Sequence, residues 1–226
     1  MDGMRDDAGA DKSSVVPALS FRWATRFYDP VVRLTVRDAT VKNALIDAAL
    51  SGSERTVLDI GAGTGTLAIG LRSRGSGLLV AALDADQEIL QFARKKANAS
   101  GTDIDLIAGF SDRIPIVSGS VDLAVSSFFF HHITNTERAR TFAEILRVLR
   151  AGGRLFFADF GKPADALQAV LSLPIRIGDG WKRTLDNFRG NLTGDLERAG
   201  FAETGELGHF RTMLGTVRLC SATKAE

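Results

Sequence analysis

The fold of this chain is decided by the stretch Val57-Leu58-Asp59-Ile60-Gly61-Ala62-Gly63-Thr64-Gly65. A mostly apolar run leads into three glycines at alternating positions, which is typical of a strand that ends in a tight turn and continues as a helix. Because glycine has no side chain, a bound molecule can approach the bare backbone at the carboxyl end of the strand. We therefore expect a ligand site at this turn.

The spacing of the glycines argues against a diphosphate ligand. A dinucleotide-binding turn has the pattern G-x-G-x-x-G, but here Thr66 stands at the third glycine position and Gly65 comes one residue early. No lysine follows the glycines as it does in a phosphate-binding P-loop. These differences disfavour a nicotinamide-dependent oxidoreductase, which stays open as an alternative.

Around this turn, short apolar runs alternate with longer amphipathic segments. The runs predict strands at 56–60, 78–83, 104–108, 121–126 and 154–160. Helices are predicted at 86–100 and 134–150, the second with a capping box at Thr134 and Glu137 and a stop at Gly152-Gly153. Such alternation predicts an α/β fold, a doubly wound Rossmann-like sheet covered on both faces.

The two ends of the chain depart from this alternation. Residues 191–199 predict a last helix, and the runs 202–207 and 212–222 predict a C-terminal antiparallel hairpin, which completes a seven-stranded mixed sheet. At the other end, residues 1–20 read as a disordered tail. The rest, 21–226, is expected to be a single domain with an N-terminal helical lid (21–50) and an insertion after strand five (161–190).

Composition excludes several classes of protein. The chain has 226 residues, and its 28 Lys+Arg against 27 Asp+Glu give a net charge of +1, so no strong field attracts nucleic acid. No apolar run reaches the length of a membrane span, and the polar N-terminus lacks the pattern of a signal peptide. The single cysteine, Cys220, excludes an internal disulfide and is in keeping with the cytoplasm.

Two acidic residues define the kind of ligand. Asp84 ends the second predicted strand, where a carboxylate faces the same crevice and accepts both hydroxyls of a ribose. Asp59 adds negative charge beside the turn, which disfavours a phosphate and favours a cation. A nucleoside with positive charge and no phosphate, S-adenosyl-L-methionine, fits both.

With these features the sequence resembles the class I S-adenosylmethionine-dependent methyltransferases. The resemblance rests on four motifs in order: VLDIGAGTG (57–65), ALDAD (82–86), GSVDLAVSSFFFHHI (119–133) and EILRVLRAGGRLFFADF (144–160). Phe27-Tyr28-Asp29 and the pattern L-x-x-A-G-F ending at Phe201 are similar to the small-molecule branch that includes the ubiquinone and menaquinone C-methyltransferases. The resemblance implies in-line transfer of a methyl group to a small-molecule acceptor, such as a quinone or a phenolic metabolite.

The resemblance also implies a set of cofactor-binding positions. Asp59 would meet the ammonium, Asp84 the ribose diol and Ile89 the adenine. The full set is Tyr28, Asp59, Gly61, Ala62, Gly63, Gly65, Asp84, Ala85, Ile89, Phe110, Ser111, Asp112 and Ser127. Many relatives carry Gly-Asp-Ala after the third strand, where the Asp reads the adenine amino group. This chain has Gly109-Phe110-Ser111, so either Asp112 replaces that Asp or Phe110 stacks on the ring.

For the chemistry, His131 and His132 follow the fourth strand and are the candidate general bases. The alternative is that they only close the end of the sheet, because alignment alone can drive transfer from an activated donor. No metal-ligand spacing occurs, so no metal is expected. A second alternative is a protein that binds the cofactor without methyl transfer, as a sensor, a partner subunit or a non-methylating catalyst.

Overall fold

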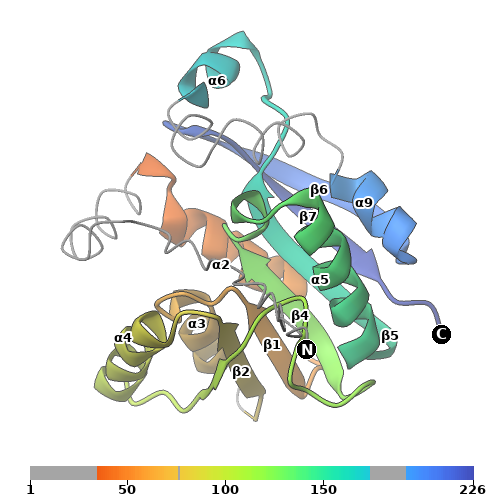
Figure 1. The fold of residues 1–226 in the computed structure, drawn as a ribbon. Coiled ribbons are helices and arrows are strands. Elements are labelled where there is room, and N and C mark those ends of the chain that lie inside the picture. The colour runs from red at the N-terminus through yellow and green to blue at the C-terminus, as the bar shows by residue number, and fades with distance from the viewer. Residues whose placement is uncertain (1–34, 76, 174–191) are drawn as a thin grey trace, which may run out of the picture.

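The computed structural model describes residues 35–75, 77–173 and 192–226, and in these ranges seven strands form one sheet (Figure 1). Their order is β3-β2-β1-β4-β5-β7-β6, parallel except for β7, which is antiparallel to both β5 and β6. The strands are β1 (Thr56–Ile60), β2 (Leu79–Asp84), β3 (Asp105–Ala108), β4 (Val121–Ser127), β5 (Leu149–Phe160), β6 (Ala202–Thr212) and β7 (Gly215–Thr223). The predicted seven-stranded mixed sheet with a C-terminal hairpin is confirmed.

Helices cover both faces of the sheet (Figure 1). The helices α2 (Asp38–Ala49), α3 (Thr66–Arg74) and α4 (Gln87–Ala99) lie on one side, and α5 (Asn135–Val148) and α9 (Leu192–Ala199) on the other. Because successive strand residues face opposite sides, Val57 and Val80 pack under α2 and α3 while Leu58 and Ile60 pack with α5. Two apolar cores result, one on each face.

Capping fixes the start of α5 as the sequence predicted. The Thr134 hydroxyl accepts from the Glu137 amide, and the Glu137 carboxylate accepts from the Thr134 amide at 2.7 Å. The end of α5 was predicted wrongly, because the helix stops at Val148 and β5 begins before the two glycines. Leu149 is buried and pairs with Val121, which draws it into the sheet.

The hairpin also differs from its predicted limits. β6 extends to Thr212 and β7 starts at Gly215, so the turn is Met213-Leu214. Register shifts near Gly205 and Gly208 let β6 stay paired with β7 although its side-chain pattern is irregular. The strand run expected at 202–207 was therefore too short.

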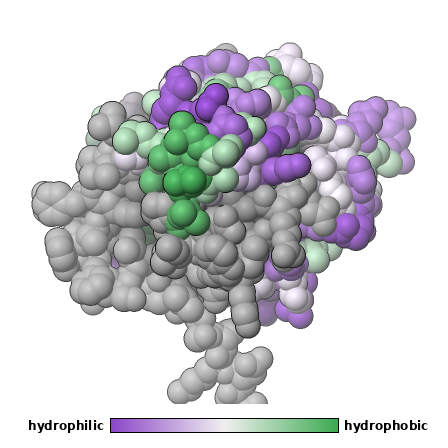
Figure 2. Space-filling view, turned by 90° about the horizontal axis from the view of Figure 1, so that it is seen from above, coloured by the Kyte–Doolittle hydropathy of each residue, from purple (hydrophilic) through white to green (hydrophobic). Residues whose placement is uncertain are grey.

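Parts of the predicted organisation lie outside the described residues. These are the tail 1–20, residues 21–34 of the N-terminal lid with Tyr28, and residues 174–190 of the insertion. The described start of the insertion forms α6 (Ala166–Leu171) above the end of β5, and apolar side chains gather there in the view from above (Figure 2). Within the described ranges no helix is long and apolar enough to cross a membrane.

Candidate functional site

The turn after β1 is built by hydrogen bonds to its neighbours. The Ala62 amide donates to the Leu83 carbonyl at 3.0 Å, which extends the pairing of β1 and β2 into the turn. The Gly63 amide donates to Oδ2 of Asp84 at 2.8 Å. The loop thus stays beside the end of β2, as the rule for parallel sheets predicted.

The three glycines have left-handed backbone angles but different surroundings. A Cβ on Gly61 would lie 2.2 Å from the Phe129 ring, and one on Gly65 would lie 3.0 Å from the Ala93 side chain. A Cβ on Gly63 would meet only Ile89, at 4.0 Å. Of the three, Gly63 alone has no close neighbour among the described residues, so it is the glycine at which a ligand can approach the backbone.

Asp84 lies at the end of β2 with both carboxylate oxygens held. Besides the bond from Gly63, the Asp86 amide donates to Oδ1 at 2.9 Å. Burial raises the pKa of Asp84, and these amides partly oppose the rise. Each carboxylate oxygen has a second lone pair, so a ribose diol can still bind. Ala85, the next residue, is exposed to solvent.

Asp59 is buried inside the same turn. Its Oδ2 accepts from the Ala68 amide in the first turn of α3 at 3.1 Å, while its Oδ1 has no hydrogen-bond partner among the described residues. Burial raises the pKa of Asp59 to about 7, against the nearby charge of Lys42. A buried oxygen without a donor is costly, and an ammonium group would satisfy it.

These observations fit S-adenosylmethionine. Its ammonium matches the Asp59 oxygen that lacks a partner among the described residues, its ribose matches Asp84, and the space that these residues leave at Gly63 admits the chain between them. Beyond Asp84, Phe110 and Asp112 follow β3, and Ile89 stands in the first turn of α4. The Ser111 hydroxyl is 2.8 Å from that of Thr141, so it is engaged with α5.

The exit of β4 carries a strained backbone. Ser127 is half-buried, and Phe128 has a φ of 54°, which is unfavourable for a large side chain. This conformation turns the chain so that Phe128 packs on Phe160 and Phe129 covers Gly61. Phe130 lies in the core among aromatic rings.

The two histidines behave differently. His131 is buried, and its Nδ1 lies 2.6 Å from Oδ1 of Asp159 near the end of β5. His132 is exposed, and its ring centroid lies 3.8 Å from that of His131. Although water reaches His132, the surrounding protein atoms and the neighbouring His131 lower its pKa.

Asp159 was missed by sequence reasoning. Burial would raise its pKa, but His131 and the Phe160 amide, which donates to Oδ1 at 2.7 Å, outweigh this, so the pKa is lowered. The only signal in the sequence was a lone acid within the apolar strand RLFFADF. The partner of such a residue cannot be read from spacing, because His131 lies 28 positions away.

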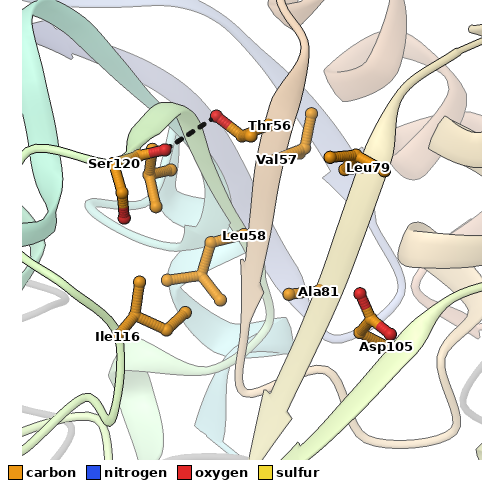
Figure 3. A pocket seen from close by; sticks show the side chains of 9 residues that line it. Thr56, Val57, Leu58, Leu79, Ala81, Asp105, Ile116 and Ser120 are labelled. Carbon is orange, nitrogen blue, oxygen red and sulfur yellow. Dashed lines mark hydrogen bonds between the residues drawn. The ribbon is translucent and has the colours of Figure 1, made fainter.

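The described residues also line two cavities outside the glycine turn. One of about 240 Å³ lies at the opposite, amino-terminal edge of the sheet, between β1, β2 and Ser120 (Figure 3). Its lining does not include the glycine turn, Asp59 or Asp84, so we do not take it as the ligand site. The other, of about 180 Å³, adjoins β5 and α9. Its lining is Gly161, Lys162, Leu192, Thr193, Glu206, Arg218 and Cys220.

Comparison with known proteins identifies the family to which the chain is similar. The profile of a family described as "Methyltransferase domain" matches residues 57–153. A demethylmenaquinone methyltransferase of Thermus thermophilus is 32% identical over 60% of this chain and 62% of its own length. The ubiquinone/menaquinone biosynthesis C-methyltransferase UbiE of Paracoccus denitrificans is 32% identical over 74% of this chain and 67% of its own length.

A solved structure shows the same fold. The YcgJ protein of Bacillus subtilis superposes with a TM-score of 0.67 at 16% identity, covering 83% of this chain and 99% of that one. The fold and site define the class I Rossmann-like methyltransferases. The chain belongs to the S-adenosylmethionine-dependent methyltransferase family, which indicates S-adenosylmethionine as its cofactor. It spans less than two thirds of the Thermus relative.

The glycine geometry predicts unequal effects of two alanine substitutions. Gly61→Ala should lower the free energy of unfolding by about 2–5 kcal/mol, because the strain of a positive φ, about 1–2 kcal/mol, adds to the collision of its Cβ with Phe129, about 1–3 kcal/mol. Gly63→Ala, the matched control, carries only the backbone strain of about 1–2 kcal/mol and should instead weaken cofactor binding. Urea unfolding and calorimetry measure both. Equal losses of stability would contradict the assignment.

The raised pKa of Asp59 predicts a pH dependence of stability. The folded state keeps a proton up to about pH 7, whereas the unfolded state loses it near 3.8, so stability from this group falls between those values. Asp59→Asn cannot ionise. As the pH rises through that window, its free energy of unfolding should therefore increase relative to that of the wild type by up to about 1.4 kcal/mol per pH unit. Urea unfolding at pH 5 and 7.5 measures the difference, and a constant difference would show that Asp59 is ionised throughout.

Proposed function

We propose that this chain transfers the methyl group of S-adenosylmethionine to a small-molecule acceptor by in-line displacement. The single observation that carries the proposal is the pairing of a glycine turn open at Gly63 with two buried or half-buried acids, Asp59 and Asp84. Dinucleotides present a diphosphate at such a turn, and two carboxylates there would repel it.

The residues at the turn bind and orient. When bound, S-adenosylmethionine supplies a methyl group already activated on a positively charged sulfur. Asp59 holds the ammonium end and Asp84 the ribose, which fixes the direction of the methyl group relative to the end of β4. Fixed orientation alone can supply about 7–11 kcal/mol of the barrier reduction.

We assign the proton transfer to His132. It is the exposed member of the pair, and its lowered pKa keeps the ring neutral, which is the form that accepts a proton. The same shift makes it a weak base, which suffices for a hydroxyl because that group becomes strongly acidic as its oxygen bonds to the methyl group. His131 and Asp159 are positioning residues, because both are buried and bound to each other beneath His132. The buried pair gives the exposed ring a rigid support.

For the acceptor we propose a quinone or a phenolic metabolite rather than a nucleic acid, and for its compartment the cytoplasm. The relatives in Thermus and Paracoccus are named for menaquinone and ubiquinone substrates. The near-zero net charge gives no general attraction to phosphates. Phe128 and Phe129 at the exit of β4 offer aromatic surface to a flat ring.

Cofactor binding and methyl transfer are tested separately. Calorimetry with S-adenosylhomocysteine should show binding, and Asp84→Ala should weaken it by about 1.5–3 kcal/mol, the scale of hydrogen bonds to a charged group. Asp105→Ala, which removes an exposed acid at the start of β3, is the control and should bind normally. Incubation with methyl-labelled cofactor and a panel of quinones, phenols and amines should give a labelled product. Binding without any product would support a non-methylating role instead.

The histidine assignment predicts a pH profile. His132→Ala should lower kcat by about 10²–10⁴-fold without changing the affinity for S-adenosylhomocysteine. In the wild type the acidic limb of kcat should lie below pH 6.5, because the pKa of His132 is lowered. Asp159→Asn should lower kcat and shift this limb, whereas Asp165→Asn, at a surface ion pair with Arg211, should do neither. An unchanged kcat in His132→Ala would mean that alignment suffices.

A further inference from the structure

We propose that Phe110 holds the nucleobase of the cofactor by stacking, and that the carboxylate of Asp112 takes no part in base recognition. This inference rests on the proposed cofactor site and adds the means by which the base is recognised. Three observations support it: the position of Phe110 in the chain, the exposure of its ring, and the hydrogen bonds of the polar groups beside it.

The position of Phe110 follows from the pairing of β2 and β3. Ala108 pairs with Asp84, and the Gly109 amide donates to the Asp84 carbonyl at 3.0 Å. Phe110 therefore leaves the sheet directly beside the acid that holds the ribose. The open space at Gly63 lies on the β1 side of Asp84, so the base, on the other side of the ribose, falls toward β3.

Phe110 exposes a large apolar ring at the proposed cofactor site. Its side chain is 49% exposed at the edge where the glycine turn and Asp84 meet. Leaving so much aromatic surface in water is unfavourable, and a flat base would cover it. Ile89, half-buried at the start of α4, presents a second apolar side chain at the same edge.

Two polar groups beside Phe110 are engaged in hydrogen bonds within the protein. The Ser111 hydroxyl is bonded to Thr141, and the Phe110 carbonyl accepts from the Arg113 amide at 3.2 Å in a tight turn. That turn directs residues 111–113 toward α5, where the Ile114 amide donates to Glu144 at 2.8 Å. Asp112 belongs to this turn, between residues bonded to α5, whereas Phe110 directly follows the Gly109 that is bonded to Asp84.

The test compares two ligands that differ only at the base. Calorimetry measures the dissociation constants of S-adenosylhomocysteine and of its hypoxanthine counterpart, which lacks the exocyclic amino group. Phe110→Ala should weaken both ligands by the same factor, between about 5-fold and 100-fold, because stacking does not depend on the amino group. Phe110→Trp should restore binding of both.

Two matched variants separate this inference from general effects. Phe92→Ala removes a comparably exposed ring from α4 and should leave both constants unchanged. Asp112→Asn should also leave both unchanged. The inference is overturned if Phe110→Ala binds like the wild type, or if Asp112→Asn weakens only the adenine ligand. Failure of the wild type to bind either ligand would overturn the proposed function itself, whereas normal wild-type binding with an unaffected Phe110→Ala would overturn only this inference.

Discussion

The hydrogen bond from the Gly63 amide to the Asp84 carboxylate is the interaction on which the site depends. It ties the turn after β1 to the end of β2, and so it brings the open backbone and the carboxylate of Asp84 to one edge of the sheet. The left-handed angles that this turn needs explain the glycines, since a side chain at Gly61 would also displace Phe129. One backbone geometry thus links β1, β2 and the exit of β4.

Features written within a short stretch of sequence were predicted correctly. The capping box at Thr134 and the glycine turn are local patterns with local physical causes, and both occur as expected. The end of α5 depends instead on distant residues: Leu149 pairs with Val121, and the Lys224 ammonium donates to the carbonyls of Leu146 and Leu149 at 2.7 Å. A prediction made from residues 134–153 alone cannot take Val121 and Lys224 into account.

The candidate site shows the same division. Asp84 was predicted from the rule that parallel strands end at one edge, and the structure places it beside the glycine turn. Asp159 was not predicted, because its role depends on a contact between β5 and His131, which follows β4. The histidines were found as a pair, but only the fold distinguishes the buried His131 from the exposed His132. Sequence position gives the edge of the sheet, while burial and partners decide what each side chain does there.

The two buried aspartates show how surroundings separate identical groups. Asp59 and Asp159 are each 1% exposed and lie at or near the ends of parallel strands, yet their pKa values move in opposite directions. Asp159 accepts from the ring of His131 and from two backbone amides, which together outweigh its desolvation. In the part of the chain that the structure describes, Asp59 has one amide donor and one oxygen without a partner, so desolvation prevails. Asp159 is compensated by direct donors within the protein, whereas Asp59 has only the charge of Lys42 nearby to oppose its desolvation. Keeping such a group buried costs stability, and the turn after β1 is therefore the place where the cationic group of a ligand would offset that cost.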